Sequence, residues 1–224
     1  MLRPKKHLTR KDIQRDPFLE TVDQAQAHLE QNRNLYVMLG IGLIVILIGF
    51  NIVNSKRQTH SVEASSSLGQ ALIALERDDL NTARFQLETV KNDFENTESG
   101  HLSNYYLGKL KYESEELEEA KVLLNKFLDN NSYDYLMAPA HIILSDIMLR
   151  DDDLEQAINI INEGLRSVNK ESDKITLELQ KAKLLLKNGD KALSRSLIDN
   201  VLNEENLGSD HKKVAEEIFG KLTS

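Results

Sequence analysis

The stretch LGKLKYESEELEEAKVLLNKF, residues 107–127, decides the fold, because its small residues recur along the chain at one fixed interval. Small side chains return every 37 residues, and a second small column precedes the first by twelve residues. The first column is Ala83, Ala120, Ala157 and Ser194, and the second is Ala71, Gly108, Ser145 and Ala182. Small residues at two fixed places let two antiparallel helices approach closely, so the pattern predicts repeated helix–turn–helix units.

Large apolar residues follow the same 37-residue step and are expected to fill the space between neighbouring units. One column is Leu87, Leu124, Ile161 and Ile198, and another is Leu75, Tyr112, Leu149 and Leu186. Polar stretches at a common phase, around Asp78, Glu115, Asp152 and Gly189, predict the turn inside each unit. One helical pair cannot bury its apolar face alone, so we expect about four stacked hairpins and a capping helix over residues 210–222.

This column pattern resembles the tetratricopeptide repeat over residues 65–222, and the second unit matches it best. The matching small and large positions are Leu107, Gly108, Ala120, Leu124 and Phe127. The 37-residue period is longer than the usual period of about 34, and both the early aromatic residue and the turn proline of that repeat are missing. The resemblance implies an all-α fold in which residues 68–224 form a right-handed solenoid that binds proteins.

Residues 35–53 read LYVMLGIGLIVILIGFNIV and contain no charged side chain. As a helix they span about 28 Å, close to the roughly 30 Å thickness of a bilayer's hydrocarbon core, so we expect a single transmembrane helix. A buried core helix and a cleaved signal peptide are the alternatives, and both fit the segment less well because it is apolar on every face and starts 34 residues into the chain. Residues 54–67 are expected to form a polar linker.

The formal charge of -8 is unevenly distributed about this segment. Residues 1–34 carry seven Lys and Arg against five acids, whereas residues 54–224 carry 21 against 31. Within twenty residues of the segment each flank has two basic residues, but the whole tail has seven, which favours a tail that stays in the cytosol and places residues 68–224 in the periplasm of a bacterial inner-membrane protein. The acidic domain repels phosphates, so nucleic acid is not an expected partner.

The tail, residues 1–34, is expected to contain an amphipathic helix that starts at Asp16-Pro17, an N-cap followed by a proline at the first helical position. Phe18, Val22, Ala25 and Leu29 form one apolar stripe on it. The stripe suits either the inner leaflet, where the basic residues meet anionic headgroups, or a partner protein. A solvated tail is the third possibility.

Known chemical motifs are absent from the sequence. The six histidines show no metal-ligand spacing, the acidic run Asp151–Asp153 lacks the spacing of a calcium loop, and there is no cysteine. No phosphate-binding loop or nucleophilic serine elbow occurs. We therefore expect no enzyme, cofactor, metal or small-molecule substrate.

Protein binding is the remaining use of a stacked-helix domain, because such a stack presents the first helix of each hairpin on a concave surface. The residues on these helices that are candidates for partner contacts are Gln70, Asn104, Tyr105, Lys111, His141 and Met148. Tyr105 and Met148 carry the chemistry most often found at adaptable interfaces. For each of the six, ordinary packing is the alternative.

A short tail, one anchor and a repeat domain that ends in VAEEIFGKL, residues 214–222, together resemble the YfgM-like family of ancillary Sec translocon subunits. The resemblance implies partners in the SecYEG channel and in a membrane-anchored periplasmic chaperone. The basic LTRKDIQRDPF segment, residues 8–18, departs from the shorter and more acidic tail of that family. The predicted function is a membrane-tethered adaptor that assists newly translocated envelope proteins. The alternatives are an envelope-assembly or cell-division scaffold and a sensor that signals to the tail.

Overall fold

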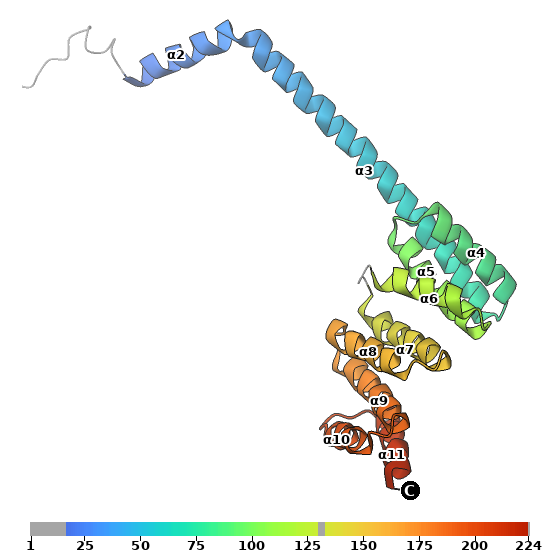
Figure 1. Ribbon diagram of the computed structural model, residues 1–224. Helices are drawn as coiled ribbons and strands as arrows, with labels where there is room; N and C mark the ends of the chain where they lie inside the picture. Colours follow the sequence, from blue (N-terminus) through green and yellow to red (C-terminus); the bar gives the residue numbers. More distant parts are fainter. Residues whose placement is uncertain (1–16, 130–132, 224) are drawn as a thin grey trace, which may run out of the picture. The chain divides into compact units, whose positions relative to one another are not determined.

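The computed structural model describes residues 17–129 and 133–223, and it divides into two compact units, residues 1–58 and 59–224. Expectations about residues 1–16 lie outside the described part of the chain. Helices, and no strands, make up the secondary structure of the described residues (Figure 1). In chain order they are α2 (Pro17–Gln31), α3 (Arg33–Glu76), α4 (Leu80–Asp93), α5 (Glu98–Glu113), α6 (Leu117–Leu128), α7 (Asp134–Arg150), α8 (Leu154–Ser167), α9 (Glu171–Lys187), α10 (Lys191–Leu202) and α11 (Ser209–Thr223).

The first unit contains α2 and the N-terminal part of α3. In the described residues, α3 is the one helix that is long and apolar enough to cross a membrane. Its large apolar side chains from Leu35 to Ile52 are exposed, and none of the most apolar stretch is buried against protein. On α2, Val22 and Leu29 of the predicted stripe are also exposed.

The prediction of a linker at residues 54–67 has to be corrected. These residues are helical and belong to α3. The stretch from Phe50 to Leu68 contains neither glycine nor proline, so nothing in it interrupts the hydrogen-bond ladder. Ala64 is fully buried and Leu68 nearly so, which brings the start of the first hairpin forward into the segment expected to be linker.

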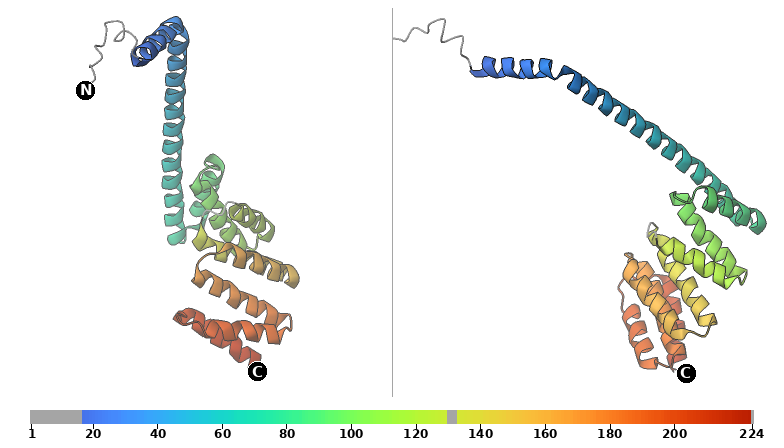
Figure 2. Two further views of the ribbon diagram at one scale, coloured as in Figure 1. Left: turned by 90° about the vertical axis from the view of Figure 1, so that its left-hand side faces the viewer. Right: turned by 45° about the horizontal axis from the view of Figure 1, so that its top comes forward.

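Four hairpins build the second unit, and they pair the C-terminal part of α3 with α4, α5 with α6, α7 with α8, and α9 with α10. The views in Figure 2 show the pairs following one another in chain order from green to red. Every residue of both small columns is buried, and so are Leu87, Leu124, Ile161 and Ile198. The spacing is tight: a Cβ added at Gly108 would lie 2.8 Å from Leu124 Cγ. The predicted hairpins are confirmed.

The turn inside each hairpin also repeats its backbone geometry. Asp78, Glu115 and Asp152 have φ of 60°, 62° and 61°, and Gly189 has φ of 88°. In all four turns the next amide donates a hydrogen bond to the carbonyl five residues back at 2.9 Å, which ends the first helix with a left-handed residue. The phase of the polar turns in the sequence therefore marks one defined backbone conformation.

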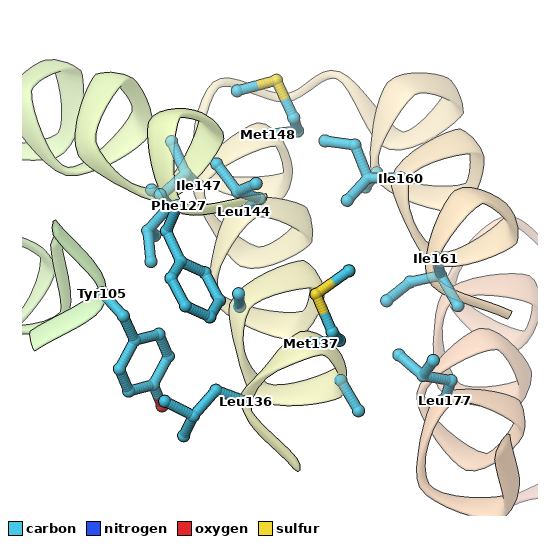
Figure 3. Packing of buried hydrophobic residues seen from close by; sticks show 14 of the residues in the cluster. Tyr105, Phe127, Leu136, Met137, Leu144, Ile147, Met148, Ile160, Ile161 and Leu177 are labelled. Carbon is cyan, nitrogen blue, oxygen red and sulfur yellow. The ribbon is translucent and has the colours of Figure 1, made fainter. Parts of the chain in front are cut away.

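The central cluster of buried apolar residues extends from the second hairpin to the fourth. In the middle of the unit, Phe127 of α6 packs with Tyr105 of α5, and Met137 of α7 lies toward Ile161 and Leu177 (Figure 3). At the C-terminal end, α11 contacts α9 and α10, and its Ala215 and Ile218 are buried in a separate cluster. This helix has the position predicted for a cap. The right-handed sense of the stack stays a prediction.

Candidate protein-binding groove

Four of the six candidate contact residues lie in the interior. Asn104, Tyr105, His141 and Met148 are each at most 6% exposed, whereas the side chain of Gln70 is exposed. Tyr105 and Met148 belong to the central apolar cluster. These placements correspond to the packing alternative, so the four buried side chains present no open surface.

Asn104 and His141 bond to the backbone of their own helices. Asn104 Nδ2 donates to the carbonyl of Gly100 at 3.1 Å, and His141 Nδ1 lies 2.8 Å from the carbonyl of Met137. Burial lowers the pKa of His141, because the apolar interior disfavours the charged imidazolium. A Cβ at Gly164 would lie 2.9 Å from His141 Cγ, so the imidazole fills a tight gap between α7 and α8.

Lys111 forms ion pairs across the turn between α5 and α6. Its Nζ lies 2.5 Å from Glu116 Oε2 and 2.7 Å from Glu119 Oε2, and 11% of its side chain is exposed. The hydrogen bond to Glu116, followed by that to Glu119, raises the pKa of Lys111. Because both acids are already on the same hairpin, Lys111 holds α5 to α6 with its charge matched locally.

A groove with an apolar floor opens between α3 and α5, the first helices of the first two hairpins. Its cavity volume is about 440 Å³. The lining residues are Leu72, Leu75, Glu76, Asp78, Leu80, Tyr106, Lys109, Leu110 and Glu113. Four leucines and one tyrosine supply the apolar surface, and the charged side chains surround it.

The local fold of the first turn positions one wall of this groove. Asp78 ends α3 in the left-handed conformation, and Asp79 then caps α4 by accepting a hydrogen bond from the Thr82 amide at 3.2 Å. Hydrogen bonding from the Thr82 side chain, followed by that from the Thr82 amide, lowers the pKa of Asp79, which keeps the carboxylate charged at the positive end of the helix. Leu80 begins α4 directly after the cap and remains largely exposed beside the groove.

The rim of the groove is acidic. Glu76, Asp78 and Glu113 face one base, Lys109, whose Nζ lies 3.8 Å from Glu113 Oε1. Tyr106 is half-buried, and burial raises its pKa, so its hydroxyl stays protonated. An apolar floor inside a negative rim suits a protein segment with an apolar side chain next to a basic one.

A second cavity of about 600 Å³ lies near the loop between α10 and α11. Glu171, Glu204 and Glu205 line it together with asparagines, and Ile175 is its one large apolar lining residue. No cluster of three metal-ligating side chains occurs in the described residues. The groove between α3 and α5 is therefore the better candidate for holding a peptide.

Four of the six candidates lie on α3 and α5, the helices that form this groove, and two lie on α7, but none of the six lines it. Tyr105 was a candidate contact with packing as its alternative, and it packs inside while its neighbour Tyr106 lines the groove. Successive residues on a helix differ by about 100° in direction, so an error of one position exchanges surface for core. Leu75 and Asp78 belong to columns that the repeat already marked, and following their 37-residue phase leads to Tyr112 and Glu115 rather than to the second wall.

Comparison with a family model agrees with this architecture. The family model described as tetratricopeptide repeat-like domain matches residues 26–196. A search of curated proteins gives no match. A solved structure from the functional characterization of Pseudomonas aeruginosa PilF is similar, with a TM-score of 0.44 and 15% identity, over 73% of this chain and 92% of that chain. Because the family model covers more than half of its residues, this chain belongs to the tetratricopeptide repeat-like domain family.

Proposed function

We propose that this protein is a non-catalytic, membrane-tethered adaptor whose groove between α3 and α5 binds a segment of a partner protein. The observation that carries the proposal is the open floor formed by Leu72, Leu75, Leu80, Tyr106 and Leu110. Tetratricopeptide-type repeats are stacks whose extended concave surfaces bind other chains. A cavity of about 440 Å³ has room for one or two large side chains, which is the usual anchoring mode of such an interface.

The acidic residues at the rim favour a partner segment with a positive charge. Lys109 is already close to Glu113, so Glu76 and Asp78 leave an excess of negative charge around the floor. A partner segment with a leucine or phenylalanine followed by lysine or arginine meets both parts of the site. Binding of such a segment weakens as salt is added, because the rim charges are exposed to solvent.

Residues 35–53 serve as the membrane anchor in this proposal. A helix that exposes apolar side chains from Leu35 to Ile52 gains free energy by entering lipid. Tethering confines the groove to the membrane surface and raises its effective concentration near membrane-bound partners. We propose that the tail is cytosolic and the repeats are periplasmic. We further propose, from the resemblance to the YfgM-like family, that the partners are SecYEG, a membrane-anchored chaperone and newly translocated chains.

Site-specific photo-crosslinking in intact membranes tests the groove. We place a photoreactive phenylalanine analogue at Tyr106, inside the groove, and at Val122, which is exposed on α6 outside the groove lining. The expected result is a defined protein adduct from position 106, lost when Leu72→Asp is added, and no such adduct from position 122. The adduct should also weaken when Glu76→Lys reverses the rim charge.

The identity of the adduct separates the possible roles. Translocon subunits or newly exported chains support the role at the secretion channel, whereas outer-membrane assembly or septal proteins support the scaffold alternative. Equal adducts from positions 106 and 122, or an adduct that survives Leu72→Asp, would overturn the groove as the binding site. Protease digestion of spheroplasts that leaves residues 68–224 intact would overturn the periplasmic placement.

A further inference from the structure

The groove lies at the first junction, the place where the first helices of the first two hairpins, α3 and α5, meet. One repeat further along the chain, the second junction between α5 and α7 has equivalent positions. Four lining positions of the groove are equivalent to the members of one polar network in the second junction. The equivalent residues are Leu75 and Tyr112, Asp78 and Glu115, Lys109 and Asp146, and Glu113 and Arg150.

In the second junction, the side chain of Arg150 contacts all three other members of this network. Its Nη1 donates to Glu115 Oε2 at 2.5 Å, its Nη2 to the Tyr112 hydroxyl at 3.1 Å, and its Nε to Asp146 Oδ2 at 3.2 Å. The guanidinium carbon lies 4.8 Å from the centroid of the Tyr112 ring, and the Tyr112 hydroxyl donates to Asp146. An arginine of the third hairpin therefore binds the turn and the first helix of the second hairpin.

The first junction lacks the base that the later junctions carry. At the phase of Arg150 the third junction has Lys187, whereas the first has Glu113. The acid of the turn is retained as Asp78, which forms no ion pair within the described residues. The first junction therefore places two carboxylates at the positions where the second has a carboxylate and a guanidinium.

The bases near the groove do not replace the missing arginine. Lys109 is paired with an acid of its own helix, and Arg77, beside Asp78 in the sequence, is exposed and does not line the groove. Glu76 adds a further acid, so three acids and one base line the cavity. This excess of negative charge favours a cation from outside at the position that Arg150 occupies in the second junction.

We propose that the groove recognises an arginine of the partner segment, whose guanidinium pairs with Asp78 and Glu113 while an adjacent apolar side chain lies on the leucine floor. This inference rests on the proposed function of the groove and names the side chain that it selects. Arg150 is the precedent, because its guanidinium already contacts two carboxylates and an aromatic ring at equivalent positions. In the groove, Tyr106 is the aromatic residue of the lining.

The composition of the site favours arginine over lysine. A guanidinium presents five N–H donors in a planar fork, and Arg150 uses three different nitrogens for three acceptors. A lysine ammonium is a compact point of charge and is more strongly hydrated. Its transfer from water to a groove with an apolar floor therefore costs more free energy.

Peptide binding to the full chain in detergent micelles tests this preference. The probe is fluorescein-labelled Gly-Ser-Leu-Arg-Ser-Gly, and matched peptides carry lysine or citrulline, the neutral analogue of arginine, in its place. Fluorescence anisotropy should show the arginine peptide binding about fivefold more tightly than the lysine peptide and about tenfold more tightly than the citrulline peptide. Asp78→Asn should remove most of this preference. Asp152→Asn, the same change in a turn with the same left-handed backbone, should leave it intact.

Exchanging the charges of Lys109 and Glu113 tests the site at constant net charge. The double substitution Lys109→Asp and Glu113→Arg copies Asp146 and Arg150 onto the first junction. The new arginine should pair with Asp78 and occupy the groove, so binding of the arginine peptide should fall about tenfold although the charge of the lining is unchanged. The thermal midpoint should rise by about 1 to 2 °C and lose this gain when Asp78→Asn is added.

The opposing results separate this inference from the proposed function. Equal binding of the three peptides, or binding of the arginine peptide that survives the charge exchange, would overturn the selection of arginine. If Leu72→Asp still weakens all three peptides, the groove remains the binding site. Absence of arginine-peptide binding while the Tyr106 photo-adduct still forms in membranes would also overturn the selection of arginine alone. Absence of that adduct in the unsubstituted repeat domain is instead the failure of the proposed function.

Discussion

The two ends of the repeat domain differ in how far they bury an isoleucine. At the C-terminal end, α11 packs on α9 and α10 and buries Ile218. At the other end, Ile73 of α3 stays half exposed, although its counterparts in later hairpins are core residues. The comparison shows that the repeat pattern prepares each hairpin for two neighbours, and that the presence of a neighbour decides whether a position is core or surface.

The strongest test compares one isoleucine at each end. Ile218→Ala should cost about 2 to 5 kcal/mol, because it removes buried methyl groups and leaves a cavity under α11. Ile73→Ala should change stability by about 0.5 kcal/mol or less, because this side chain is already half exposed. Urea unfolding followed by far-UV circular dichroism measures both, and equal losses would show that Ile73 is also covered in the folded chain.

The turns of the first and last hairpins provide a second comparison. Gly189 has φ of 88° and no atom within 4 Å of its missing Cβ, so Gly189→Ala should cost about 1 to 2 kcal/mol through backbone strain alone. Asp78 already has φ of 60°, and Asp78→Gly should stabilise the first hairpin by roughly 0.5 kcal/mol. Thermal unfolding measures the opposite shifts in midpoint, and shifts of the same sign would contradict the shared turn geometry.

A smaller effect concerns how the cap is attached. The Arg195 guanidinium of α10 lies 4.0 Å from the ring centroid of Phe219 on α11. Arg195→Gln should weaken the C-terminal end by about 0.5 to 1 kcal/mol, the range for an exposed cation–π contact. Hydrogen exchange should speed up in α11, whereas Arg166→Gln on α8 should leave that rate unchanged. Unaltered exchange in α11 would mean that its apolar face alone holds the cap.

The change with the smallest effect on stability at neutral pH is at His141 on α7, in the middle of the repeat domain. Burial lowers the pKa of His141, so the unfolded chain binds its proton more readily than the folded chain. Stability is therefore complete above the unfolded pKa of about 6.5 and is lost as pH falls through the lower folded value. At pH 5, the amides of α7 and α8 should lose protection from hydrogen exchange before those at either end of the repeat domain. In His141→Gln, which cannot titrate, this acid sensitivity should disappear.

The repeat was predictable from the sequence because it depends on the size and polarity of residues at fixed positions. The small columns that include Ala83 and Ala71 required close helix approach, and polar turns at the phase of Asp152 required a break in the helix. Both are local consequences of packing and backbone geometry. The terminal cap was predictable for the same reason, since Val214 and Ile218 continue an apolar stripe on an otherwise charged helix.

The groove required information that the columns do not contain. The interval of 37 residues states which residues are equivalent, but it does not state which side of a helix meets a neighbour and which side meets solvent. Tyr105 and Tyr106 are chemically identical neighbours, and only their directions separate core from groove. The start of the first hairpin was missed because a polar composition suggested a linker, while the absence of helix-breaking residues allowed α3 to continue through it.

Because the repeat length is constant, the chain can be shortened by one repeat without changing the register of the remaining helices. Excising residues 116–152 would join Glu115 to Asp153 and keep the columns after the junction in register with those before it, since 37 residues are removed. Removing 36 or 38 would turn the following helix by about 100° and send its alanines toward water. Length in this protein can therefore be altered in whole hairpins, each one moving the capped end by a single increment.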